Sequence, residues 1–578
     1  MEKIPLKTFF ETVEQRLADC SVEELRDILR AMAQQTSPSE RHAFLEKLKP
    51  PAEMNSLAQQ APKDDFLAEI EDLAGELEEA MEDAEGWEEE HGWYEEYDEE
   101  DSVGTYEDFL QPLARLFDQA QAAFDYGNLS LARDAYRALF ELCDQQDDYG
   151  RGVGIEDLEG VEKDEAYARY LRAVYETASA EQRAGELFEQ MLQVQSWIAG
   201  ARPTFEDVIQ ISPKPLPDLG RFWLEWVAFL KEKPGNEADA WLREAIRLSQ
   251  GTPGLEELAR AEGKKRPRAY LDWLAALEQE ERYLDELSAA QEVLRTLPAG
   301  LPIRAAVADY LCMAALHLKD IQVLRAGRWE AFVANPLLAR LLDLWDVTLD
   351  SERLIQMQQA VQHIRNYMAQ SRPQPEAEYP SGDDLERPVW IRNTVLMHAS
   401  FLGEDWRAAH QMAANEQVLG WSSSENIQGF VLAFFLVLLS GKSTAGLPGN
   451  LAQLWQERLN NSSGYWFSEE NSLSRRLERA YANLFERITL NSSEQSEALA
   501  WSLEVANRRV DAIVGGQHRG SYDKAAMLIT ASAEVLGLRG EKDKADALLS
   551  AVRNRFPRHR AFHSELNSAI QRISTAYT

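Results

Sequence analysis

Apolar residues recur at intervals of three and four over most of the chain, which is the spacing of one face of an α-helix. The pattern is clearest in two neighbouring stretches that a Gly127-Asn128 turn separates. Their apolar positions are Leu113, Leu116, Phe117, Ala120 and Phe124, and then Ala132, Ala135, Tyr136, Leu139, Phe140 and Cys143. Two such stretches joined by a tight turn predict a helical hairpin over residues 113–143.

The same hairpin pattern returns later in the chain. A glycine is followed five residues later by an alanine in four places, which are Gly127–Ala132, Gly235–Ala240, Gly403–Ala408 and Gly540–Ala545. A large residue lies nine positions after the first, third and fourth of these glycines, as Tyr136, Met412 and Leu549, whereas Glu244 follows the second. Small residues let two helices approach, and large residues fill the groove of the next hairpin.

This pattern resembles the tetratricopeptide repeat family of helical hairpins. The resemblance implies stacked hairpins over residues 109–570, with gaps between them. The predicted fold class is therefore all-α, with irregular tetratricopeptide-like hairpins stacked into two lobes. A small helical module and an acidic flexible segment are expected to precede these lobes.

Breaks in the helical pattern divide the chain into five parts. We expect a small helical module over residues 1–50 and an acidic, largely disordered linker over 51–108. A first helical-repeat lobe is expected over 109–370 and a second over 389–578. Residues 371–388 contain four prolines and no apolar periodicity, and they are interpreted as a hinge between the lobes.

Charge is distributed unevenly along the chain of 578 residues. The net charge is −38, and 22 acidic residues with no Lys or Arg lie between Asp64 and Asp108. Like charges at this density resist compaction, which favours a mobile segment. Direct nucleic-acid binding is disfavoured, because phosphate contacts need a basic surface. A protein partner with a basic or extended segment suits this composition better.

Aromatic residues interrupt the acidic run, and a basic cluster lies near the end of the chain. An inert solvating linker is one interpretation of the run, and an arm that docks on a basic groove is another. The basic cluster fits either a solvated helix end that complements the helix dipole or a counter-surface for carboxylates. The candidate partner-binding residues are Trp87, Trp93, Tyr94, Tyr97, Arg553, Arg555, Arg558 and Arg560.

We recognise no sequence motif for catalysis, metal binding or cofactor binding. Gly441-Lys442-Ser443 lacks the earlier glycine of a nucleotide-binding loop, because position 436 is Leu436. The three cysteines lie in helical patterns, and we interpret them as reduced core thiols. We expect no catalytic residue, cofactor or metal.

Neither a membrane span nor an export signal is expected. The longest apolar run, Phe430 to Leu439, is about half the length of a membrane-spanning helix and predicts a buried helix instead. The N-terminal sequence lacks the pattern of an export signal, which favours the cytoplasm.

The leading functional hypothesis is a non-catalytic cytoplasmic adaptor that binds a protein partner, in an oligomeric state that the sequence does not determine. An alternative comes from the two-lobed plan with a hinge, which resembles the substrate protein of the caspase-like protease of type III-E CRISPR systems. That resemblance implies a bacterial defence protein that is cleaved and that restrains a sigma factor or a similar partner. A third hypothesis is an enzyme of unknown class, with acid and base residues in a groove between the lobes.

Overall fold

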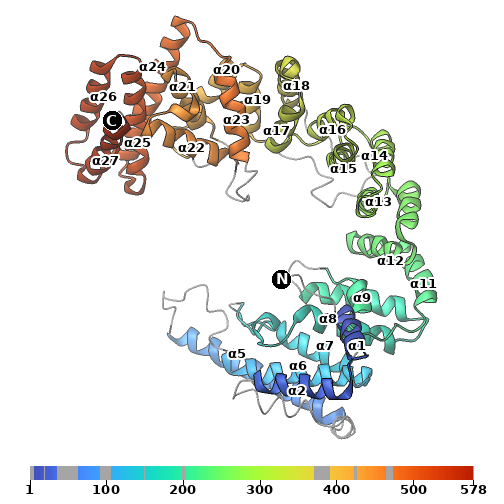
Figure 1. The fold of residues 1–578 in the computed structure, drawn as a ribbon. Helices are drawn as coiled ribbons and strands as arrows, with labels where there is room; N and C mark the ends of the chain where they lie inside the picture. The colour runs from blue at the N-terminus through green and yellow to red at the C-terminus, as the bar shows by residue number, and fades with distance from the viewer. Residues whose placement is uncertain are drawn as a thin grey trace. The chain divides into compact units, whose positions relative to one another are not determined.

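The computed structural model describes residues 6–18, 20–35, 63–91, 106–148, 150–197, 202–369, 391–421, 426–463 and 473–576 (Figure 1). Over these residues the secondary structure is helical and contains no strand. The prediction of an all-α fold is confirmed.

Contacts between helices divide the chain into two compact units, residues 1–257 and residues 258–578. The helices up to this boundary are α1 (Leu6–Ala18), α2 (Val22–Gln35), α5 (Lys63–His91), α6 (Glu107–Asp125), α7 (Leu129–Cys143), α8 (Lys163–Thr177), α9 (Arg183–Trp197), α10 (Phe205–Gln210) and α11 (Leu219–Glu232). Helix α12 (Asn236–Glu262) crosses the boundary, and Gly251 interrupts it with non-helical backbone angles (φ 64°, ψ −157°).

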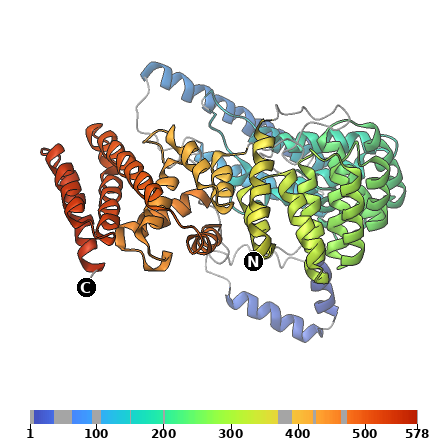
Figure 2. The same ribbon diagram turned by 90° about the horizontal axis from the view of Figure 1, so that it is seen from above.

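The second unit begins with a row of helices, each packed against the next (Figure 2). They are α13 (Arg268–Gln279), α14 (Tyr283–Thr296), α15 (Ile303–Leu318), α16 (Ile321–Ala334), α17 (Leu338–Val347) and α18 (Asp350–Ala369). The remaining helices are α19 (Asn393–Leu402), α20 (Trp406–Ala414), α21 (Gln428–Ser440), α22 (Gly449–Ser463), α23 (Leu473–Phe485), α24 (Ser492–Val510), α25 (Tyr522–Leu538), α26 (Lys542–Arg555) and α27 (Arg560–Ala576).

Five hairpins among the described residues share one turn geometry. They are α6–α7, α13–α14, α15–α16, α19–α20 and α25–α26, and the residue that closes the first helix has a positive φ in each, as Gly127, Glu281, Lys319, Glu404 and Gly540. The next backbone N–H then donates to the carbonyl five residues earlier, for example from Asn128 to Ala123 (2.9 Å). This is the Schellman arrangement, which satisfies the last carbonyls of a helix.

The turn geometry corrects two of the expected repeat positions. Gly403 has a negative φ and Glu404 takes the left-handed position instead, so the buried alanine is Ala409 rather than Ala408. Gly235 precedes α12 and accepts a hydrogen bond from the Asp239 N–H (3.1 Å), so it opens a helix rather than closing one. Glycine spacing was a partial guide because glutamate and lysine also occupy this turn position.

The acidic segment is helical where the structure describes it, which corrects the expectation of a largely disordered linker over residues 51–108. Helix α5 buries a stripe of apolar side chains and packs against α7. The stripe comprises Phe66, Ile70, Leu73, Leu77 and Met81. Burial of five apolar side chains offsets the repulsion among the carboxylates. Residues 92–105 lie outside the described residues.

One hydrophobic core extends to both sides of residues 371–388, the segment expected to be a hinge between two lobes. One hydrophobic cluster contains residues from Phe332 to Val535, on both sides of that segment, and α18 packs against α19. Prolines mark a break in helical pattern but do not determine whether the flanking helices share a core. The segment itself lies outside the described residues.

Helix α21 lies within this core. Almost all of its side chains are buried, which confirms the prediction of a buried helix at residues 430–439. No helix in the described part of the chain combines the length and the apolar character needed to cross a membrane.

Candidate binding sites

The predicted aromatic residues fall at or beyond the end of α5. Trp87 belongs to the helix, but its side chain is not among those that the structure describes. Trp93, Tyr94 and Tyr97 lie outside the described residues.

The four predicted arginines lie together around the turn between α26 and α27. Arg553 donates to Asn567 Oδ1 (2.7 Å), and Arg555 donates to Asp511 Oδ1 (2.5 Å). These contacts tie neighbouring helices of the same unit together. Arg558 and Arg560 are exposed. Half of this cluster therefore has a structural role within the C-terminal unit.

The face of α5 opposite its apolar stripe is acidic. Glu69 pairs with Arg115 of α6 (2.7 Å), which helps to fix the helix on its neighbours. Seven further carboxylates are exposed and form no ion pair with another described residue. They are Asp65, Glu71, Asp72, Glu76, Glu78, Glu79 and Glu82. Because the apolar face is buried, the helix presents these carboxylates in a fixed orientation.

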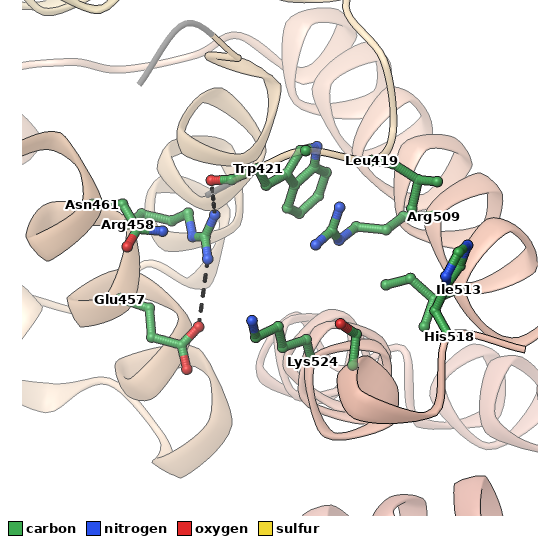
Figure 3. A pocket seen from close by; sticks show the side chains of 11 residues that line it. Leu419, Trp421, Glu457, Arg458, Asn461, Arg509, Ile513, His518 and Lys524 are labelled. Atoms are coloured by element: carbon green, nitrogen blue, oxygen red, sulfur yellow. Dashed lines mark hydrogen bonds and ion pairs between the residues drawn. The ribbon is translucent and has the colours of Figure 1, made fainter. Parts of the chain in front are cut away.

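A second candidate site, in the C-terminal unit, is a pocket of about 520 Å³ (Figure 3). Its walls come from the segment before α21, from α22, from α24 and its continuation, and from α25. The charged side chains that line it are Glu457, Arg458, Arg509 and Lys524, with His518 at one side. Glu457 is the one carboxylate among the lining residues.

Trp421 holds two arginines in this pocket. The Cζ atom of Arg509 lies 3.9 Å from the centre of the indole ring, and that of Arg458 lies 5.8 Å from it. Both arginines are 7% exposed. Arg458 Nη1 donates to the Trp421 carbonyl (3.0 Å), and Arg509 Nη1 donates to the Val418 carbonyl (2.5 Å).

The surroundings of Arg509 disfavour the positive charge of its guanidinium. Burial, and then the like charge of Arg458, lower the pKa of the Arg509 guanidinium, while Glu457 acts in the opposite direction. Arginine nevertheless stays protonated at neutral pH. The pocket therefore holds buried positive charge that an anion would stabilise.

The backbone beside the pocket is irregular. Helix α24 continues into a π-helical turn at Asp511–Gly515, and π-helical turns are frequent at functional sites. Ile513 of this turn lines the pocket, and Gln517 after it has a positive φ of 58°. The chain then brings His518 to the pocket wall.

Sequence reasoning missed this pocket, because its residues are spread from position 419 to position 524. One usable signal was an arginine on an apolar stripe. Arg458 lies between Trp455 and Leu459, and Arg509 lies between Ala506 and Val510, and all four neighbours are buried. An arginine at such a position must find acceptors or an aromatic face.

Among the described residues, no group of three or more His, Cys, Asp or Glu could hold a metal ion. Cys20, Cys143 and Cys312 are free, and burial is the main cause that raises the pKa of Cys143 and Cys312 to about 12. Both of these thiols are therefore protonated and unreactive at neutral pH.

The fold defines the class of this molecule as an all-helical protein built largely from packed hairpins, which is compatible with a helical-repeat fold. Comparison with models of known protein families finds no match, and comparison with characterised proteins finds no significant match either. The resemblance to tetratricopeptide repeats, and that to the CRISPR protease substrate, therefore stay predictions.

Proposed function

We propose that this protein is a non-catalytic helical-repeat adaptor, working in the cytoplasm, that binds a basic segment of a protein partner on the acidic face of α5. The observation that carries the proposal is the pairing of a buried apolar stripe with seven exposed carboxylates on one helix. The apolar stripe holds the helix in place, and the carboxylates are left for an external partner. The free cysteines support a reducing compartment.

The physical basis of binding would be charge complementarity. Carboxylates fixed on one helix face attract a Lys- or Arg-rich segment without first having to be ordered, which lowers the entropic cost of association. Such attraction steers the encounter and weakens as salt screens it. Packed hairpins elsewhere in the chain would supply further contact surface.

The test is a pull-down from the native cell with two matched charge variants. In the first, α5 loses five exposed carboxylates through Glu71→Gln, Asp72→Asn, Glu76→Gln, Glu78→Gln and Glu79→Gln. In the control, five exposed carboxylates of the C-terminal unit are neutralised in the same way, at Glu504, Asp523, Asp543, Asp546 and Glu565. Both variants change the net charge from −38 to −33, since each removes five negative charges.

The proposal expects one protein to be recovered by the unmodified chain and by the control but not by the α5 variant. Equal recovery by all three would contradict a role for α5. Loss of recovery with both variants would show a nonspecific effect of net charge and would also contradict the proposal.

A further inference from the structure

We propose that the pocket lined by Trp421, Arg458, Arg509 and Lys524 binds the doubly charged phosphate group of a small molecule. The proposal concerns the C-terminal unit alone and does not depend on the function proposed for α5. It rests on the charge, the direction and the size of the pocket.

The first observation is a charge excess. Arg458, Arg509 and Lys524 bring three positive charges to the pocket, and Glu457 brings one negative charge. The excess of two matches a phosphate ester, which carries about −1.5 to −2 at neutral pH. A carboxylate would leave one positive charge unbalanced. Such an excess is conspicuous in a chain whose net charge is −38.

The second observation is convergence. Figure 3 shows the cationic ends of Arg458, Arg509 and Lys524 pointing into the same space from three different helices. The guanidinium of Arg509 lies over the Trp421 ring and donates a hydrogen bond to the Val418 carbonyl. An arginine fixed in this way has lost its side-chain freedom before the ligand arrives, and its planar fork matches phosphate oxygens.

The third observation is size. A volume of about 520 Å³ lies within the range of small-molecule pockets and exceeds what a bare phosphate needs. Leu419 and Ile513 offer an apolar wall, and Asn461 offers a polar one. The remainder of a phosphate ester therefore has room beside its anionic group.

A purely structural role for the arginines accounts for less of this arrangement. The bonds to the carbonyls of Val418 and Trp421 tie the segment before α21 to helices α22 and α24. That role needs neither Lys524, which is exposed and comes from α25, nor the convergence of three cations. Ligand binding explains both features.

The experiment is titration calorimetry of the full chain with inorganic phosphate, glycerol 3-phosphate, sulfate and acetate. Lys524→Gln removes one exposed cation and should weaken glycerol 3-phosphate binding about 3- to 10-fold. Arg509→Gln should weaken it at least about tenfold, provided that its unfolding temperature shows a folded chain. Lys542→Gln, an exposed lysine of α26, is the matched control and should bind as the unmodified chain does.

The pH dependence separates a phosphate site from a general cationic surface. Lowering the pH from 7.5 to 5.5 partly protonates a phosphate ester, whose second pKa is about 6, and should weaken its binding. Sulfate stays doubly charged over this range, so its binding should not weaken. Acetate should bind weakly at both pH values.

Each result supports or overturns the proposal. Tighter binding of glycerol 3-phosphate than of inorganic phosphate identifies an ester as the ligand, and equal binding identifies free phosphate as the source. The proposal is overturned if Lys524→Gln and Lys542→Gln behave alike, if acetate binds as well as phosphate, or if no anion binds to the unmodified chain.

Discussion

The guanidinium of Arg509 stacks on the indole of Trp421, with its Cζ atom 3.9 Å from the ring centre. The same ring approaches Arg458, so one aromatic side chain stabilises two buried cations that repel each other. This relationship explains how a strongly acidic protein retains a cationic pocket. Each arginine also donates to a backbone carbonyl, and Arg458 pairs in addition with the Glu457 carboxylate at 3.5 Å.

Trp421→Leu should therefore destabilise the C-terminal unit. The change removes a buried indole and its cation–π contacts, for an expected loss of about 3–5 kcal/mol in unfolding free energy. Trp421→Phe keeps an aromatic face and should cost less. Denaturant unfolding of the three proteins measures both values, and equal losses for Leu and Phe would show that the cation–π contacts contribute nothing.

The buried carboxyl group of Glu286 should make the folded protein less stable as pH rises. Among the five shared turns it occupies the position that Ala132, Ala409 and Ala545 fill elsewhere, and it is 0% exposed. Neither of its carboxylate oxygens has a hydrogen-bond partner among the described residues. Burial, and then the charge of Glu278, raise the pKa of Glu286 from 4.5 to about 7.

Because the folded-state pKa lies above the ordinary value, the neutral carboxyl stabilises the fold fully below pH 4.5, and this stability is lost as pH rises through 7. The loss by pH 8 should be up to about 3 kcal/mol. Glu286→Gln cannot ionise and serves as the comparison. Thermal unfolding at pH 5 and pH 8 should show a smaller fall for the glutamine variant, and an identical fall would contradict the assignment.

The buried imidazole of His398 should make the folded protein less stable as pH falls. It is buried, its Nδ1 is joined to Tyr481 Oη by a hydrogen bond of 2.8 Å, and burial lowers its pKa from 6.5 to about 3. Because the folded-state pKa is depressed, stability is full above pH 6.5 and is lost as pH falls toward 3. The loss approaches about 1.4 kcal/mol per pH unit.

The variant His398→Phe with Tyr481→Phe removes both hydrogen-bonding partners and leaves no orphaned hydroxyl. Unfolding of this variant between pH 7 and pH 5 should show a shallower acid loss than the unmodified chain shows. A pH slope as steep as that of the unmodified chain would mean that other groups cause the acid loss.

The continuous core across residues 371–388 predicts that a cut chain stays together. A protease site inserted after Pro380 allows one controlled cleavage of the full-length protein. The fragments should co-elute in gel filtration, because side chains between Phe332 and Val535 share one core. Separation of the fragments without denaturant would contradict this account and would favour the hinge between independent lobes that the sequence suggested.

The helices could be anticipated from the sequence better than their turns or their sites. Gly127 and Gly540 revealed two hairpin turns, because glycine adopts a positive φ at little cost. Glu281, Lys319 and Glu404 hide the same turn, since the hydrogen bonds of the Schellman arrangement stabilise a strained residue of almost any type.

Long-range relationships were beyond the reach of the sequence. The apolar stripe of α5 was visible in the spacing of Phe66, Ile70 and Leu73, but charge repulsion suggested that the segment would not pack. Arg458, Arg509 and Lys524 meet only because three helices pack around one space. No short stretch of the sequence shows that these three side chains lie close together.

The central claim is that the acidic face of α5 binds a basic partner segment, and the most direct measurement is the affinity of the recovered partner at several salt concentrations. The unmodified chain and the control with five neutralised carboxylates in the C-terminal unit should lose affinity steeply as salt rises. The α5 variant should bind more weakly at low salt and lose little more as salt rises. Matching affinities and salt slopes for all three proteins would contradict the claim.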